Sequence, residues 1–301
     1  MRQHLRELGM LTALALAGCA ARPSAPTTGP EWDVAYVAVV DGEFDIWQFN
    51  TSTRIRRNLT SLHGLDYAPR WSSTAQLLVF YSNRAGNDDI YLMAADGSQV
   101  RQVTALPSRD HSPVMSPDGR QIAFVSNRDG NNEIYVSARD GSGARRMTNN
   151  RVHDEAPAWS PDGSRLVYSS SDGGDGDLWI VTVSTASSQR LLRREGFDTS
   201  PDWSPDGREI AFQGVVPDGV GMFIVNTDGS SLRRLPADRS DERHPRWSPD
   251  GQWILFTAST GAGNSVDSDV WCQSIDGTRR FAIVAGPGRQ EMASWLGVGA
   301  R

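Results

Sequence analysis

The chain has 301 residues, of which 38% are hydrophobic, and it contains 29 glycines and 16 prolines. Its formal net charge of −6 argues against a nucleic-acid partner held by phosphate contacts, because such a partner requires a basic stripe. Frequent glycine together with a scarcity of helix-like runs favours an all-β, turn-rich protein.

The N-terminal residues 1–18 are predicted to be a lipoprotein signal peptide. Two arginines precede an apolar run from Leu8 to Ala17 that is too short to span a bilayer. The run ends in Leu-Ala-Gly-Cys, which resembles the end of a bacterial lipoprotein signal. The resemblance implies cleavage before Cys19 and acylation of its thiol, and Ala20 after the cysteine implies sorting to the outer membrane. The alternative is an ordinary signal peptide with an incidental cysteine.

Residues 19–31 are predicted to form a flexible tether. Ala, Pro, Ser, Thr and Gly dominate the stretch from Ala20 to Pro30, which shows no apolar periodicity. This composition is typical of an extended linker. Lipid anchoring at Cys19 would leave Cys272 without an intramolecular disulfide partner, and its place in the repeats described below predicts a buried residue.

A pattern of seven residues, Pro-x-Trp-Ser-Pro-Asp-Gly, recurs along the rest of the chain. It is complete at 157–163, 201–207 and 245–251, has methionine in place of tryptophan at 113–119, and is degenerate after Pro69. The Trp or Met position recurs every 44 residues, at Trp71, Met115, Trp159, Trp203 and Trp247. A fixed period of this size indicates a repeat architecture.

One repeat is predicted to contain four short β-strands. In residues 110–148 a first strand at 111–115 leads into Ser-Pro-Asp-Gly, whose residue types favour a tight turn. Two apolar runs follow at 121–126 and 133–137, and 144–148 forms a more polar edge strand. Four antiparallel strands in one such repeat are typical of a propeller blade.

The two ends of the chain are predicted to complete a sixth blade. Residues 34–36, 45–47 and 57–60 match the second, third and fourth strands of a repeat, and residues 291–296 match a first strand through Trp295. We therefore predict an all-β fold over residues 32–301: a six-bladed β-propeller of four-stranded blades, its last blade closed by the C-terminal inner strand and three N-terminal strands. This closure removes exposed sheet edges.

A polar residue lies three positions before the proline position of each repeat, where one blade crosses to the next. These residues are Asp66, Asp110, Asp154, Asp198, Glu242 and Gln290. We expect them to ring one mouth of the central channel. Either each carboxylate accepts backbone hydrogen bonds in its own crossover loop, or the ring binds a cation or a basic partner segment.

Arg84 and Arg128 are predicted on the same face, in loops between second and third strands. A surface of mixed acids and arginines suits docking of a protein or peptide, and solvated hairpin tips are the alternative. Four histidines also fall in the crossover loops, so they are candidate metal ligands. They are weak candidates because each occupies a different position relative to the acid of its loop. They are His63, His111, His153 and His244. The acids of residues 172–177 are suited to weak Ca²⁺ binding or to a hairpin turn, so we expect no cofactor beyond a weakly bound divalent cation.

The full repeat, Asp-x-x-Pro-x-Trp-Ser-Pro-Asp-Gly followed by Ile-Ala-Phe, Asp-Ile-Tyr, Asp-Gly and Leu-Thr, resembles that of TolB-like propellers over residues 33–296. TolB is the periplasmic partner of the Pal lipoprotein, and its α/β domain has no counterpart in the short stretch after Cys19. The resemblance implies a non-enzymatic, monomeric, periplasmic protein that acts as a protein- or peptide-binding scaffold. TolB itself is soluble, so the expected lipid anchor rests on the N-terminal signal and departs from the family pattern. A Pal-like lipoprotein is then a candidate partner, with a role in envelope integrity or transport.

The alternative function is that of a propeller hydrolase or lyase acting on carbohydrate, with a metal site of histidines and acids on the crossover-loop face. Some lyases of pectin fragments have similar repeats and use histidine-bound metal there. The sequence contains no Gly-x-Ser-x-Gly nucleophile elbow of a serine hydrolase. We therefore predict no catalytic residues.

Overall fold

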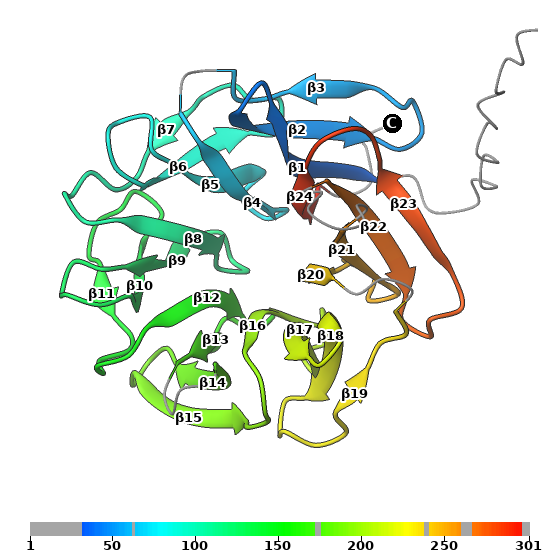
Figure 1. Cartoon of the computed structure of the whole chain (residues 1–301). Helices are drawn as coiled ribbons and strands as arrows, with labels where there is room; N and C mark the ends of the chain where they lie inside the picture. Colours follow the sequence, from blue (N-terminus) through cyan, green and yellow to red (C-terminus); the bar gives the residue numbers. More distant parts are fainter. Residues whose placement is uncertain (1–31, 62–63, 172–175, 238–240, 260–266, 297–301) are drawn as a thin grey trace, which may run out of the picture.

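The computed structural model describes residues 32–61, 64–171, 176–237, 241–259 and 267–296. The predicted signal peptide and tether, including Cys19, lie outside this part of the chain. The described residues form six four-stranded antiparallel sheets, which Figure 1 shows arranged around a common centre. The prediction of an all-β six-bladed propeller is confirmed. The described residues include no helix that could span a membrane.

Each blade has an innermost, a second, a third and an outermost strand. The innermost strands are β4 (Asp66–Ser72), β8 (Asp110–Met115), β12 (Asp154–Trp159), β16 (Asp198–Trp203), β20 (Glu242–Trp247) and β24 (Gln290–Trp295). The second strands are β5 (Leu77–Ser82), β9 (Gln121–Ser126), β13 (Arg165–Ser170), β17 (Glu209–Val216), β21 (Trp253–Ser259) and β1 (Asp33–Val40). The third strands are β6 (Asp89–Ala94), β10 (Glu133–Ala138), β14 (Asp177–Thr182), β18 (Gly219–Asn226), β22 (Ser268–Ser274) and β2 (Glu43–Asn50). The outermost strands are β7 (Arg101–Gln102), β11 (Arg145–Arg146), β15 (Ser187–Leu192), β19 (Arg233–Arg234), β23 (Arg280–Val284) and β3 (Arg56–Asn58).

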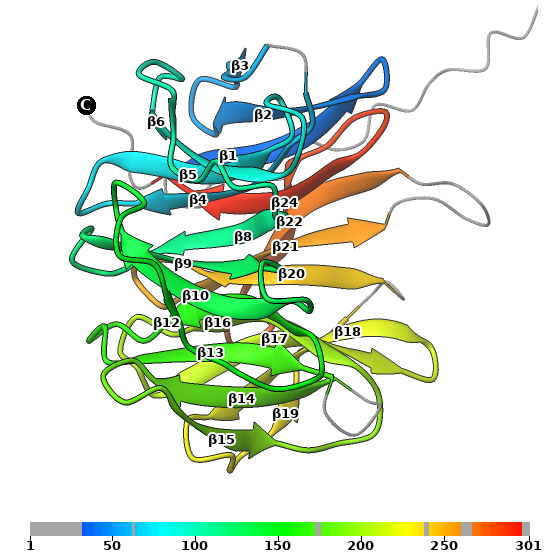
Figure 2. The same cartoon turned by 90° about the vertical axis from the view of Figure 1, so that its left-hand side faces the viewer.

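The blade that joins the two ends of the chain has the strand order β24-β1-β2-β3. Strand β24 pairs antiparallel with β1, with Val34 opposite Trp295 and Ala38 opposite Gln290. Figure 2 shows the ring from the side, with β24 beside β4 of the first complete blade. The predicted closure is therefore confirmed: the C-terminal strand β24 is the innermost strand of this blade and is paired with β1.

Neighbouring blades pack face to face. One core cluster joins Val125 of β9 and Ile134 of β10 to Trp159 and Leu166 of the next blade. Strands β9 and β10 are buried on both faces for this reason, and they read as largely apolar runs in the sequence. Strand β2 of the closing blade is more exposed. Cys272 is buried in the core cluster that includes the closing blade, as predicted.

Every innermost strand contains a β-bulge near its middle. In β4, Tyr67 lies opposite Tyr81 and Arg70 opposite Val79, so Ala68 and Pro69 share one partner position. The residue at the start of the bulge has a φ between 50° and 55° in all six blades. These residues are Ala68, Ser112, Ala156, Ser200, His244 and Met292. The bulge explains how proline is accommodated in a paired strand, and it turns this stretch toward the centre of the ring.

Candidate functional site

The six residues that begin the innermost strands lie on one face of the ring. The crossover loop before each of them is hydrogen-bonded to the loop between the second and third strands of the same blade. In blade β8–β11, Asn127 N donates to Arg109 O at 3.3 Å, and Arg109 N donates to Asn127 Oδ1 at 2.9 Å. In the neighbouring blade Asn83 N donates to Leu65 O at 3.4 Å. We call the side of the ring formed by these two sets of loops the mouth face.

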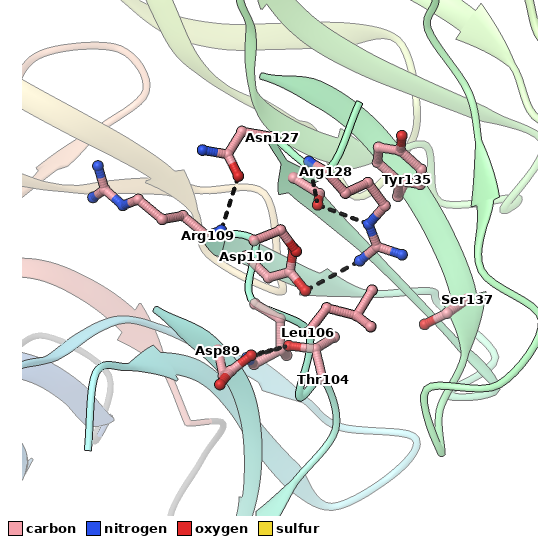
Figure 3. A network of polar contacts seen from close by, with 12 residues as sticks. Asp89, Thr104, Leu106, Arg109, Asp110, Asn127, Arg128, Tyr135 and Ser137 are labelled. Carbon is pink, nitrogen blue, oxygen red and sulfur yellow. Dashed lines mark hydrogen bonds and ion pairs between the residues drawn. The ribbon is translucent and has the colours of Figure 1, made fainter. Parts of the chain in front are cut away.

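Two of the predicted acids are paired with the two predicted arginines. Arg128 Nη2 donates to Asp110 Oδ2 at 3.1 Å, and the guanidinium lies over the ring of Tyr135, 4.6 Å from its centroid (Figure 3). Arg84 Nη2 donates to Asp66 Oδ1 at 2.8 Å in the same way. Both carboxylates are fully buried, while the arginine side chains are 13% and 18% exposed.

Two further acids are paired with arginines from other parts of their blades. Arg194 of the preceding crossover loop donates from Nε to Asp198 Oδ1 at 2.7 Å. Arg280 of β23 donates to Glu242. Both guanidinium groups also lie over aromatic rings of their blades, so the same physical arrangement is built from different sequence positions.

Asp154 and Gln290 differ from the other four. Asp154 is also fully buried, but no arginine lies within ion-pair distance of it in the described residues. It accepts a hydrogen bond from Asn150 Nδ2 at 2.7 Å, and burial raises the pKa of its carboxyl to about 6. Gln290, in the closing blade, donates from Nε2 to Pro287 O at 3.0 Å.

The six side chains are thus placed around one face, and all are buried, with exposures of 0–4%. Their partners lie within their own blades or in the crossover loop just before the strand, which is the arrangement expected for a structural role in each crossover. A partner would have to break these contacts to reach the carboxylates. Binding at these six residues and at Arg84 and Arg128 stays a prediction.

The mouth face carries a row of aromatic side chains. Phe44 of β2 lies 4.8 Å from Tyr67 between ring centroids, and Tyr67 stacks on Tyr81 at 5.5 Å with an interplanar angle of 13°. Tyr81 in turn lies 6.0 Å from the ring of His111. All four side chains are partly exposed. We call Phe44, Tyr67, Tyr81 and His111 the aromatic row.

Charged side chains flank the aromatic row at both ends. Arg289 lies over Phe44, 5.5 Å from the ring centroid, and pairs with Glu291 at 2.8 Å. At the other end, Nδ1 of His111 is 3.9 Å from Glu155 Oε2. Burial lowers the pKa of His111 and the Glu155 carboxylate opposes part of that effect, so the imidazole is mainly neutral at pH 7.

Arg109 adds an exposed cation beside the row. Its side chain is 68% exposed and pairs with Asp88 Oδ2 at 2.7 Å. The mouth face therefore offers apolar ring surface bordered by both signs of charge. Such a surface can bury rings while pairing charged groups of a partner.

Phe44, Tyr67 and Tyr81 were not among the residues predicted to bind a partner. The signal was present in the register: Tyr67 and His111 directly follow the first residues of β4 and β8. Tyr81 is the cross-strand partner of Tyr67. The position after each acid, read across all blades, would have pointed to this row.

The histidines do not converge in the described residues. His111 belongs to the aromatic row, His153 is exposed in its crossover loop, and His244 lies in β20 at a bulge position. Among the described residues no group of three or more His, Cys, Asp or Glu side chains is arranged to hold a metal ion. His63 and most of the acidic loop 172–177 lie outside the described residues, so a weakly bound cation stays a prediction.

Several solved structures share the fold. TolB from Acinetobacter baumannii matches with a TM-score of 0.76 at 22% identity, covering 88% of this chain and 66% of that chain. The putative TolB from Agrobacterium tumefaciens matches with a TM-score of 0.69 at 24% identity, covering 85% and 89%. An oligogalacturonate lyase from Vibrio parahaemolyticus matches with a TM-score of 0.56 at 15% identity, covering 85% and 75%. At these identities the likeness shows the fold alone, and the chain spans slightly less than two thirds of the A. baumannii protein.

Comparison by sequence identifies the family. No curated protein matches the sequence. The family model of the TolB β-propeller domain matches residues 21–152 and 148–274, which together cover most of the chain. The chain therefore belongs to the TolB β-propeller family.

Proposed function

We propose that this protein is a non-enzymatic binding scaffold of the cell envelope, which docks a peptide segment of a partner protein on its mouth face. The observation that carries the proposal is the aromatic row, in which four partly exposed rings lie in contact across neighbouring blades. Aromatic and arginine side chains supply most of the binding energy at protein interfaces. Both kinds are gathered here.

The position of the row on the fold also favours docking. Tyr67, Tyr81 and His111 lie on strands β4, β5 and β8, and Phe44 lies on β2 of the closing blade. Strands of a closed ring hold these rings in fixed positions, so little conformational entropy is lost when a partner covers them. A peptide segment that presents apolar and charged side chains fits the bordering Arg289–Glu291 pair and the Glu155 carboxylate beside His111.

The proposed location is the periplasm, with the chain anchored to the outer membrane by a lipid on Cys19. The motif Leu-Ala-Gly-Cys at residues 16–19 and membership of the TolB propeller family support this location. A monomeric propeller on a short tether would meet partners close to the membrane surface, and a Pal-like lipoprotein is the first candidate. Cys19→Ser should abolish metabolic labelling by palmitate and release the chain from the membrane fraction. Full labelling of the Cys19→Ser variant would exclude this anchor.

Cross-linking in intact cells tests the docking proposal. The wild-type chain should capture a partner from the envelope, and the double substitution Tyr67→Ala and Tyr81→Ala should weaken binding of that purified partner about thirtyfold or more, as expected when interface hot spots are removed. The matched control is Leu232→Ala, which removes an apolar side chain that is 42% exposed in a loop between third and outermost strands. It should leave binding unchanged. A partner bound equally by the double variant and the wild type would refute docking on the aromatic row.

A further inference from the structure

The six β-bulges enclose a cavity in the centre of the ring. Its volume is about 110 Å³, and its walls are formed by the bulge residues, the prolines that follow them and two arginines. One water molecule needs roughly 10–15 Å³ of such space, so the cavity has room for a small ligand. It is distinct from the aromatic row, none of whose residues lines it.

The charged side chains that line the cavity in the described part of the chain are both cationic. They are Arg70 of β4 and Arg246 of β20, and no carboxylate is among the lining residues. His244 also lines the cavity, but burial lowers the pKa of its imidazole to about 4, so it is neutral at pH 7. The electrostatic character of the cavity is therefore set by two guanidinium groups.

One of these two charges is compensated by Asp202, which is not among the lining residues. Arg70 Nη2 donates to Asp202 Oδ1 at 2.6 Å, a contact between blades that lie three repeats apart. The other oxygen of Asp202 accepts a hydrogen bond from Trp247 N at 2.9 Å. Asp202 thus pairs with Arg70 and with the backbone of β20, and no ion pair between Asp202 and Arg246 is found in the described structure.

Arg246 carries the second charge without a carboxylate. Its Nη1 donates to the carbonyls of Pro245 at 2.7 Å and Ser200 at 3.4 Å, and in the described residues no acid lies within 4 Å of it. Nη1 of Arg70 is also buried, and it has no hydrogen-bond partner in the described structure. A guanidinium withdrawn from water is costly unless an anion or further acceptors pair with it.

We propose that this cavity is a binding site for a short-chain monocarboxylate, whose carboxylate pairs with Arg246 and the free Nη1 of Arg70. The planar fork of a guanidinium matches a carboxylate group, and one negative charge compensates the one unpaired cation. The walls between the arginines include proline rings and Met292, which suit a short alkyl chain. The same chemistry is offered by a free acid such as propionate and by the C-terminal carboxylate of a peptide. The proposal stands apart from docking at the aromatic row.

Isothermal titration calorimetry of the full mature chain with sodium propionate tests the site. Propionate should bind with one-to-one stoichiometry. Sodium chloride at the same ionic strength should not compete with it. Arg246→Gln should weaken binding by roughly ten- to a hundredfold, the loss expected for a charge-assisted hydrogen bond. The control Arg208→Gln removes an arginine that is 84% exposed on the surface, and it should bind propionate like the wild type.

A second variant keeps the test independent of any folding defect at Arg246. Ala156→Met fills the cavity from the opposite wall and leaves both arginines in place, and Met292 shows that the bulge position accepts this side chain. It should abolish binding while preserving the circular dichroism spectrum. Propionate binding by Ala156→Met, equal binding by Arg246→Gln, or no binding by the wild type would each overturn the proposal for the free acid.

A pair of short peptides then separates the two sources of the carboxylate. Ac-Ala-Ala with a free C-terminus should compete with propionate if the channel admits a chain end, and its C-terminal amide should not. Competition by the acid alone assigns the site to peptide C-termini as well as free acids. Competition by neither restricts the site to free acids, and equal competition by both would show that the carboxylate is not recognised.

Discussion

Two neighbouring blades bury an aspartate at the same repeat position in different ways. Asp110 and Asp154 each begin an innermost strand, and both side chains are fully buried. Asp110 is paired with the Arg128 guanidinium at 3.1 Å. Forty-four residues after Arg128 the sequence has Asp172 instead of arginine. Asp154 is held by neutral hydrogen-bond donors, among them the Asn150 amide at 2.7 Å and the hydroxyls of Ser170 and Thr148.

The difference changes what each carboxyl contributes. A buried carboxylate beside a guanidinium keeps its charge at low cost, because the opposite charge replaces the lost hydration. Without one, burial outweighs the neighbouring hydrogen bonds and raises the pKa of Asp154 to about 6. Burial of the repeated aspartate is thus compensated in two ways, by an ion pair in one blade and by a raised pKa, which allows partial protonation, in the other.

Breaking the Asp110–Arg128 pair in blade β8–β11 should have the largest effect on stability. Arg128→Met leaves the Asp110 carboxylate buried without its cation, and we expect the free energy of unfolding to fall by about 3–5 kcal/mol at pH 7. Urea unfolding followed by circular dichroism measures this loss. A decrease of less than about 1 kcal/mol would show that the pair behaves like a surface ion pair.

Two controls separate the pair from the loss of an arginine in general. Arg208→Met removes a side chain that is 84% exposed, and it should change stability by no more than about 0.5 kcal/mol. Adding Asp110→Asn to Arg128→Met removes the stranded charge, so the double variant should recover part of the lost stability.

Blade β12–β15, which contains Asp154, should differ from blade β8–β11 in the pH dependence of stability that its buried aspartate causes. The carboxyl of Asp154 has a pKa of about 6 in the folded chain and about 3.9 when unfolded, so the folded state binds the proton more tightly. The associated stabilisation is complete below about pH 4 and is lost as the pH rises through 6. Its full size is about 2–3 kcal/mol from this shift.

Asp154→Asn isolates this contribution, because the amide does not titrate. Relative to the wild type, the variant should gain about 2–3 kcal/mol between pH 4 and pH 8, measured by urea unfolding at several pH values. Asp110→Asn at the equivalent position provides the comparison, and it should be destabilising at pH 8 because it weakens the pair with Arg128. A constant difference between Asp154→Asn and wild type across this range would contradict the role of Asp154 as a titrating group.

The positions of these acids followed from the sequence, and their environments did not. The repeat register predicted the strand that each acid begins and the closure of the sixth blade through Trp295. It did not predict burial with an arginine, because the arginine comes from a hairpin loop at Arg128, a crossover loop at Arg194 and an outermost strand at Arg280. No single offset from the acid recovers all of these partners.

The aromatic row was missed for a related reason. Its rings come from separate strands, and their contacts depend on the pairing of Tyr67 with Tyr81 and on the packing of Phe44 from the other end of the chain. The central cavity likewise depends on the β-bulges, which bring Arg70 and Arg246 to the axis. Periodicity locates strands, but it does not show which side chains meet between blades.

The turns at the opposite end of the two blades should give the smallest effect and no difference between them. Ser116 Oγ donates to Asp118 Oδ1, and Ser160 Oγ donates to Asp162 Oδ1, both at 2.6 Å. These hydrogen bonds and those from the backbone lower the pKa of both carboxyls, that of Asp162 to about 2. Asp118→Ala and Asp162→Ala should each reduce the free energy of unfolding by about 1 kcal/mol at pH 7.

The sign of the pH dependence is opposite to that of Asp154. Because the folded-state pKa of these turn carboxyls is depressed, their stabilisation is present above about pH 4 and is lost as the pH falls toward 2. The cost of Asp162→Ala should therefore shrink between pH 5 and pH 2.5, while the difference between Asp154→Asn and wild type changes mainly between pH 4 and pH 7. If the two alanine variants differed by more than about 1 kcal/mol, the blades would differ along their whole length, and the contrast could not be assigned to the missing arginine alone.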